Sequence, residues 1–221
     1  MKALILNKFK FNQLYQDYLL KIKTDINYGL VLDTRSFQKV LIEGLLPNSI
    51  NISLIETPLK DWVPLVINPN SRLLVVSEDK LEEECYTSLN AIGYSKIDGL
   101  STTFITDSKE FDIKLNYIKN IELDVENTNQ YTNIIDCREN KEHLSGVVEK
   151  SHLMPLSKLN SSLETQSLLP SKDGEIFVYC RTGKRSMIAS SLLLRHGFTN
   201  INNINGGITR LISKGIKLIR I

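Results

Sequence analysis

The fold is decided by the stretch Phe177-Val178-Tyr179-Cys180-Arg181-Thr182-Gly183-Lys184-Arg185-Ser186, in which an apolar run leads into a cysteine and a basic, glycine-containing loop. A helical stretch at 187–196 follows at once and is closed by Gly197. The pattern predicts a strand, a tight loop and a helix, with the sulfur of Cys180 at the mouth of the loop. The backbone N–H groups of such a loop and the positive end of the helix favour the thiolate, which is the nucleophilic form of cysteine. The sequence therefore indicates a reactive cysteine directed at an anionic substrate.

Two halves of the chain repeat the same landmarks. The first half contains Leu30-Val31-Leu32-Asp33-Thr34-Arg35, and the second contains Asn133-Ile134-Ile135-Asp136-Cys137-Arg138. A second apolar strand follows in each half, at 73–76 and at 176–179. The distance along the chain from Asp33 to Ser77 equals the distance from Asp136 to Cys180, as expected for a duplicated domain.

Apolar strands that alternate with helical stretches predict an α/β fold with two domains, each a mainly parallel sheet flanked by helices. The polar stretch at 106–110 indicates the junction, so we expect domains at 1–110 and 111–221. In such sheets ligands bind at the carboxyl ends of the strands, which is where Cys180 lies.

The first half lacks the features of a reactive cysteine loop. Ser77 occupies the position of Cys180, and the residues after it, 78–84, are mostly acidic and lack glycine. Acidic side chains repel an anion, and a backbone without glycine does not easily turn its amides toward a sulfur. The segment from Ser77 to Gly93 is also one residue shorter than the segment from Cys180 to Gly197. We therefore expect the first domain to be catalytically inactive.

The second half contains the signatures Ile135-Asp136-Cys137-Arg138-Glu139, the stretch 178–186, Gly197-Phe198 and Asn205-Gly206-Gly207. These residues resemble the rhodanese (sulfurtransferase) family in its tandem two-domain arrangement. The resemblance covers nearly the whole chain, because the first half matches in strand order and in Asp33-Thr34-Arg35. It implies a cysteine that takes a sulfane sulfur from thiosulfate or another persulfide donor and passes it to a thiol, cyanide or protein acceptor. It implies no metal and no organic cofactor.

In this interpretation Cys180 is the catalytic residue. The residues expected to bind the anionic donor are those of the basic loop, Arg181, Thr182, Gly183, Lys184 and Arg185. Asp136 and Arg138 lie on one face of a strand end and are expected to form an ion pair that supports the loop. Ser186 is also expected to support the loop.

The other two cysteines are interpreted as packed residues. Cys137 points to the opposite face of its strand from Asp136, and a resolving thiol for Cys180 is the alternative role. Cys85 lies on an expected helix of the inactive half and is interpreted as structural.

Two positions depart from known relatives. Large two-domain thiosulfate sulfurtransferases have a substrate-binding arginine in the segment after Asp-x-Arg, where Glu142 stands here. The aromatic residue that often follows the Gly-Gly pair is replaced by Ile208. The physiological donor is therefore left open between thiosulfate and other persulfides.

Composition limits the partners. The 221 residues include 27 Lys and Arg against 25 Asp and Glu, a near balance that gives no indication of nucleic-acid binding. Three cysteines cannot form a disulfide framework, and their odd number suits a reducing cytoplasm. Charge interrupts the first residues before a signal-peptide core could form, and no apolar run approaches the length of a membrane span. No ligand-type residues have the spacing of a metal site.

Two alternatives to sulfur transfer are another enzyme of the same fold and a non-enzymatic function. A phosphatase or arsenate reductase of the same fold needs a loop one residue longer, so that a tetrahedral oxyanion fits above the sulfur. A non-enzymatic persulfide carrier, or a tandem module that binds a protein partner, agrees with the inactive first half. The complete loop of the second half argues against partner binding as the whole function.

Overall fold

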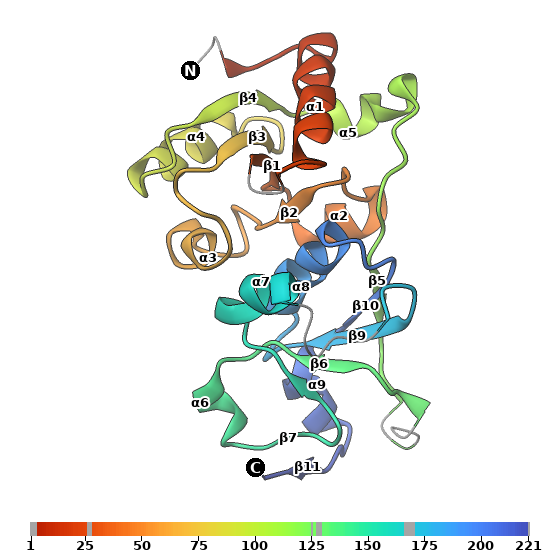
Figure 1. The fold of residues 1–221 in the computed structure, drawn as a ribbon. Coiled ribbons are helices and arrows are strands. Elements are labelled where there is room, and N and C mark those ends of the chain that lie inside the picture. The colour runs from red at the N-terminus through yellow and green to blue at the C-terminus, as the bar shows by residue number, and fades with distance from the viewer. Residues whose placement is uncertain (1–3, 26–27, 125, 127–129, 166–170, 221) are drawn as a thin grey trace. The chain divides into compact units, whose positions relative to one another are not determined.

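The computed structural model describes residues 4–25, 28–124, 126, 130–165 and 171–220 (Figure 1). The contacts divide the chain into two compact units, Met1–Tyr117 and Ile118–Ile221. The sequence prediction had the boundary between 110 and 111. Residues after 110 join the first unit because Asn116 and Leu45 exchange two backbone hydrogen bonds, each 2.8 Å long.

The first unit contains, in chain order, α1 (Lys8–Ile22), β1 (Gly29–Asp33), α2 (Phe37–Glu43), β2 (Ser49–Asn51), α3 (Leu59–Val66), β3 (Arg72–Val76), α4 (Glu82–Ala91), β4 (Ile97–Ser101), α5 (Phe104–Asp107) and the short 3-10 helix η2 (Ser108–Phe111). Its sheet has the order β2-β1-β3-β4, and all neighbouring strands are parallel. Ile5 adds a parallel bridge to Leu100 at the outer side of β4.

Helix α1 supplies much of the core of the first unit. Phe11, Tyr15 and Tyr18 are spaced so that they share one helical face, and all three are buried. Phe11 and Tyr15 pack against Phe104 of α5, with ring centroids 4.6 and 5.9 Å away. Helices α1 and α5 therefore cover one face of the sheet, and α3 and α4 pack against each other on the opposite face (Figure 1).

The second unit contains β5 (Lys119–Ile121), β6 (Ile134–Asp136), α6 (Asn140–His143), β7 (Val147–Val148), β8 (His152–Leu153), α7 (Leu156–Thr165), β9 (Glu175–Tyr179), α8 (Lys184–Arg195), β10 (Asn200–Ile204), α9 (Gly207–Ser213) and β11 (Leu218–Ile219). Five parallel strands form a sheet in the order β5-β10-β9-β6-β8, and β11 pairs antiparallel with β7. Helices α7 and α8 pack together on one face, where α8 contacts β9 and β10. On the other face, α9 packs onto the sheet through Ile208 and Leu211.

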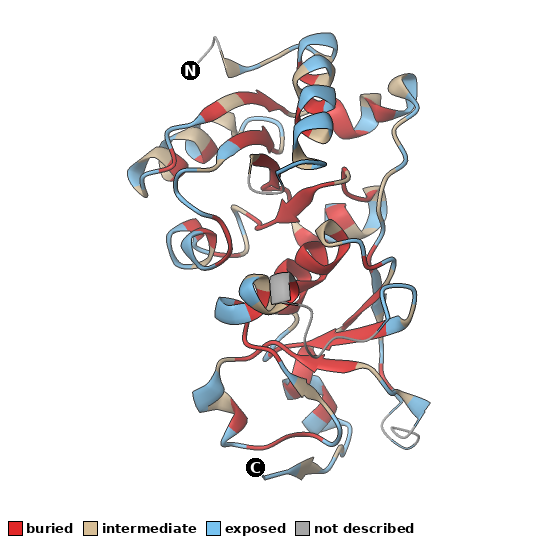
Figure 2. Ribbon diagram, viewed as in Figure 1, coloured by how far each residue is buried: buried red, intermediate tan, exposed pale blue. Residues whose placement is uncertain are grey.

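The two units repeat one topology, which confirms the predicted α/β fold with two parallel sheets flanked by helices. Strands β1, β3 and β4 of the first unit correspond to β6, β9 and β10 of the second. Asp33 pairs with Val76 in one sheet, and Asp136 pairs with Tyr179 in the other. These central strands are buried in both units (Figure 2).

Within the described part of the chain, no helix is both long and apolar enough to cross a membrane.

Candidate active site

Cys180 directly follows β9, at the carboxyl end of the central strand of the second sheet. The sequence pattern predicts helix from residue 187, but α8 begins at Lys184. Gly183 is the residue before α8, and its φ of +99° is a conformation that favours glycine. The chain turns at Gly183, so the loop is shorter than expected. Arg185 and Ser186 therefore lie in the first turn of α8 rather than in the loop.

The sulfur of Cys180 lies among hydrogen-bond donors. The Gly183 N–H donates to Sγ over an N···S distance of 3.2 Å, and the Ser186 hydroxyl donates over 3.6 Å. The residue is buried, with 1% of its surface exposed. Donors that converge on one atom, at the first turn of a twelve-residue helix, favour negative charge on that atom.

This environment makes Cys180 acidic. Burial of the sulfur raises its pKa, but hydrogen bonds from the Cys137 thiol, from Ser186 and from the Thr182 N–H outweigh burial and lower the pKa of Cys180 to about 5. The thiolate is therefore the main form at neutral pH.

Cys137 lies beside Cys180 and stays protonated. It is fully buried, and its Sγ is 3.1 Å from the carbonyl oxygen of Tyr179. Burial and the neighbouring Cys180 sulfur hold the pKa of Cys137 well above its usual value. Cys137 is thus a packed residue, as interpreted from the sequence, and as a neighbour of Cys180 it lowers the pKa of the Cys180 thiol.

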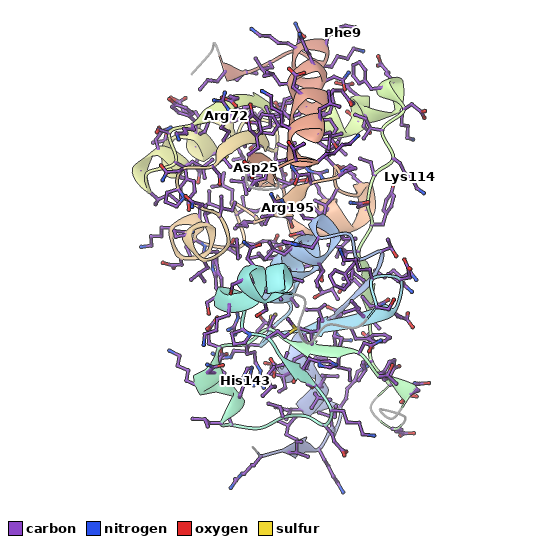
Figure 3. All side chains as sticks on the ribbon, viewed as in Figure 1. Phe9, Asp25, Arg72, Lys114, His143 and Arg195 are labelled. Atoms are coloured by element: carbon purple, nitrogen blue, oxygen red, sulfur yellow. The ribbon has the colours of Figure 1, made fainter. Side chains whose placement is uncertain are left out.

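Asp136 and Arg138 form the ion pair expected from the sequence. Arg138 Nη2 is 2.6 Å from Asp136 Oδ2 and donates to the Gly146 carbonyl over 2.8 Å, so the pair fixes the turn after β6. Both side chains are buried. His143 of α6, labelled in Figure 3, is also buried and its Nε2 lies 3.6 Å from Asp136 Oδ1.

Arg185, expected to bind the donor, contacts Glu142. Its two terminal nitrogens lie 2.5 and 2.7 Å from the carboxylate oxygens of Glu142. The hydrogen bonds from Arg185 hold the pKa of Glu142 at about 2, although partial burial opposes this. Glu142 also accepts the Glu139 N–H in a capping box of α6. The spacing of these two acids in the sequence is the signal that could have identified the capping box.

The remaining loop side chains face solvent. Arg181, Thr182 and Lys184 are exposed, so two cations of the basic loop are accessible to a ligand. The backbone of the loop thus contacts the Cys180 sulfur, whereas the side chains of Arg181, Thr182 and Lys184 are exposed to solvent.

Helix α9 donates hydrogen bonds to the backbone of the Cys180 loop, a contact that the sequence pattern does not predict. The Ile208 N–H donates to the Cys180 carbonyl over 2.8 Å, and Thr209 donates to the Arg181 carbonyl through its N–H and its hydroxyl, over 3.1 and 2.9 Å. Gly207 permits this approach, because a Cβ atom at that position would lie 2.4 Å from the Cys180 oxygen. The Gly206-Gly207 pair in the sequence is the signal for this close contact.

The matching loop of the first unit is arranged differently. Glu78, at the position of Arg181, accepts the Ser36 N–H over 2.8 Å and pairs with Lys39 over 2.9 Å. Helix α4 then begins with three acids, Glu82, Glu83 and Glu84. Burial raises the pKa of Cys85 in α4 to about 11, so this thiol is not reactive.

Among the described residues, no three His, Cys, Asp or Glu side chains are grouped so that they could hold a metal ion.

Comparison with known proteins gives a family-model match within the second unit and two relatives by sequence. Residues 122–214 match the family model of the rhodanese-like domain. A putative mitochondrial thiosulfate sulfurtransferase of Schizosaccharomyces pombe is 33% identical over 84 residues, which are 34% of this chain and 59% of that protein. A sulfurtransferase of Allochromatium vinosum is 27% identical over 86 residues, 39% of this chain and 77% of that protein. The chain thus spans less than two thirds of the length of the yeast relative.

Solved structures are similar at a more distant level. A rhodanese-related protein from Thermoplasma volcanium is 24% identical with a TM-score of 0.40, over 46% of this chain and 97% of that chain. A thiosulfate sulfurtransferase from Pseudomonas aeruginosa is 17% identical with a TM-score of 0.39, over 95% of this chain and 43% of that chain.

Proposed function

Because residues 122–214 form a rhodanese-like domain, we propose that the protein is a sulfurtransferase that holds a sulfane sulfur on Cys180 as a persulfide. The observation that carries the proposal is the environment of the Cys180 sulfur. Hydrogen bonds to Sγ and a pKa of about 5 supply a thiolate nucleophile at neutral pH.

In the first half of the reaction, the Cys180 thiolate attacks the outer sulfur of thiosulfate. A new sulfur–sulfur bond forms on Cys180, the sulfur–sulfur bond of thiosulfate breaks, and its electron pair leaves with sulfite. Exposed Arg181 and Lys184 attract the dianionic donor. The N–H groups of the loop, which point toward the Cys180 sulfur, stabilise the negative persulfide.

In the second half, a thiolate or cyanide attacks the outer sulfur of the persulfide. The bond to Cys180 breaks and its electron pair returns to the cysteine, so the cycle needs no external oxidant or reductant. All three cysteines are free thiols, which agrees with our proposal of a reducing compartment such as the cytoplasm.

Mass spectrometry of the intact protein tests this proposal. After treatment with thiosulfate, wild-type protein should gain one sulfur atom and lose it again on addition of cyanide. Cys180→Ser should gain none, whereas Cys85→Ser, which removes a buried thiol of the first unit, should react as wild type does. A sulfur adduct on Cys180→Ser would contradict the proposal. A Cys180 persulfide that passes its sulfur to an acceptor once, without repeated turnover of thiosulfate, would instead favour the carrier function.

A further inference from the structure

Cys137 and Cys180 occupy matching positions on neighbouring strands of the second sheet. Asp136 pairs with Tyr179 in the parallel register of β6 and β9, and the next residue along each strand is a cysteine. The Cys137 N–H continues the ladder by donating to the Tyr179 carbonyl over 3.0 Å. Residues at the same register position of a parallel pair direct their side chains to the same face, so both thiols lie on one face of the sheet.

The placement of the two cysteines suits a disulfide. Neighbouring strands lie about 4.7–4.9 Å apart, which is within the range of about 4.4–6.8 Å between Cα atoms that a disulfide bridges. The Cys137 Sγ is 3.1 Å from the Tyr179 carbonyl oxygen, which belongs to the peptide group that leads into Cys180. Each sulfur also affects the titration of the other. Burial and the Cys180 sulfur raise the pKa of Cys137, and the Cys137 thiol lowers the pKa of Cys180 against the effect of burial.

The first unit shows that packing at this position does not need a thiol. Thr34 corresponds there to Cys137, because Asp33 pairs with Val76 as Asp136 pairs with Tyr179. The Thr34 hydroxyl donates to the Val76 carbonyl over 3.1 Å, which is the contact that the Cys137 thiol makes in the second unit. A hydroxyl thus meets the same packing and hydrogen-bonding needs, and the thiol stands in the unit that has the reactive cysteine.

Burial decides which nucleophile can reach the Cys180 Sγ atom. Cys180 and Cys137 are both buried, and the Gly183 N–H and the Ser186 hydroxyl contact Cys180 Sγ from the loop and from α8. A thiol from solvent therefore has little access to Sγ itself, whereas Cys137 is already beside it. In a persulfide, an external acceptor would attack the outer sulfur, and Cys137 would attack Sγ.

We propose that Cys137 is a resolving thiol, which releases the sulfur of the Cys180 persulfide as sulfide when no acceptor takes it. The inference rests on the proposed function for the formation of that persulfide. The Cys137 sulfur bonds to Cys180 Sγ, and the bond between Sγ and the outer sulfur breaks. Its electron pair leaves with the outer sulfur, which takes the Cys137 proton and departs as hydrosulfide. A Cys137–Cys180 disulfide remains, and a dithiol in solution reduces it and is itself oxidised.

The proton on Cys137 makes the resolving step slow. The thiolate is the attacking form of cysteine, and burial together with the Cys180 sulfur keeps Cys137 protonated. A thiolate or cyanide from solution therefore takes the outer sulfur first. Cys137 acts on a persulfide that has met no acceptor, so the persulfide forms before the disulfide.

Mass spectrometry of the intact protein, with an assay for free sulfide, tests this role. Wild-type protein treated with thiosulfate, without thiol or cyanide, should first gain one sulfur atom. It should then lose that atom as sulfide and end two hydrogen atoms lighter than the starting protein, with a disulfide that maps to Cys137 and Cys180. Cys137→Thr, which installs the residue of the first unit, should gain the sulfur atom, keep it and release no sulfide, and so should Cys137→Ser. Cys85→Ser should follow wild type.

Hydrogen peroxide gives a second measurement that needs no sulfur transfer. The Cys180 thiolate attacks one oxygen, the oxygen–oxygen bond breaks, and hydroxide leaves a sulfenic acid on Cys180. Cys137 then displaces water from the sulfenic acid and forms the same disulfide. Wild type should end as the disulfide, whereas Cys137→Thr should continue to the sulfinic acid.

The two measurements separate this inference from the proposed function. A disulfide after peroxide, with no sulfur adduct after thiosulfate, would support the resolving thiol and contradict the proposed function alone. A persulfide that lasts as long in wild type as in Cys137→Thr would overturn the inference and leave the proposed function intact. Equal formation of sulfinic acid in the two proteins would also overturn it.

Discussion

The low pKa of Cys180 depends on single hydrogen-bond donors around a buried sulfur. The neighbouring Cys137 thiol is one of the groups that lower this pKa, so its removal should shift the titration of Cys180. In wild-type protein the rate of thiol alkylation should stay level as pH falls and then decline near pH 5, where the thiolate becomes protonated. In Cys137→Ala the pKa of Cys180 should rise by about one to two pH units, so the decline should begin at higher pH.

Cys137→Ser is the matched control, because a hydroxyl retains a donor at this position. We expect its titration to lie closer to that of wild type. An unchanged pH profile in Cys137→Ala would show that the backbone N–H groups alone hold the charge. The comparison also separates this role from that of a resolving thiol, which serine could not replace.

At this scale the sequence predicted the Asp136–Arg138 pair and a loop that favours a thiolate at Cys180, because both depend on residues close together in the chain. It did not predict the Arg185–Glu142 pair, which joins side chains 43 positions apart. Alternation along one strand places Cys137 on the face opposite Asp136, but it says nothing about the distance from Cys137 to a residue of the neighbouring strand. The parallel register that sets Asp136 beside Tyr179 is what places the next residues, Cys137 and Cys180, side by side.

Among the elements, α9 has the closest contact with the loop. In Gly207→Ala the new Cβ would meet the Cys180 carbonyl oxygen, and the residue would keep a φ of +56°. We expect this variant to lose about 2–5 kcal/mol of unfolding free energy and most of its persulfide formation. Urea denaturation and mass spectrometry after thiosulfate treatment measure the two effects.

Gly215→Ala is the control for backbone strain. Gly215 also has a positive φ, +91°, but a Cβ there would have no atom within 4 Å. This variant should lose only about 1–2 kcal/mol and should keep forming the persulfide. Similar losses in the two alanine variants would mean that the contact between α9 and the loop is not essential.

The strands were the elements best predicted from the sequence, because buried parallel strands appear as uninterrupted apolar runs. Helix α1 is not among the elements predicted from the sequence, although Phe11, Tyr15 and Tyr18 have helical spacing. The start of α8 was placed too late, since the positive φ of Gly183 could be inferred only from the closed loop.

At the scale of the whole molecule, the duplication leaves one unit with a cysteine loop and one without. We expect a Ser77→Cys, Cys180→Ser double variant to form no persulfide with thiosulfate. Glu78 directly follows the new thiol in the chain, and the Ser36 N–H and Lys39 hold its carboxylate in the first loop. A neighbouring carboxylate raises the pKa of a thiol and repels an anionic donor.

The single variant Ser77→Cys is the companion measurement, and it should bind one sulfur atom rather than two. Two sulfur atoms on Ser77→Cys, or one on the double variant, would show that the first loop is competent. In that case the absence of a thiol, and not the shape or charge of the loop, would be what distinguishes the units.

In each unit, an early stretch of chain pairs with the last strand of the parallel sheet. The Leu6 N–H donates to Leu100 at the edge of β4, and β5 pairs with β10 through the register that joins Lys119 to Asn202. On the ribosome, each sheet therefore closes only after nearly all of its own residues have emerged, which is characteristic of slow, high-contact-order folding. The first unit can finish folding while residues 118–221 are still being synthesised. The Cys180 loop is completed only after β10 and α9, which both follow it in the chain, have been synthesised.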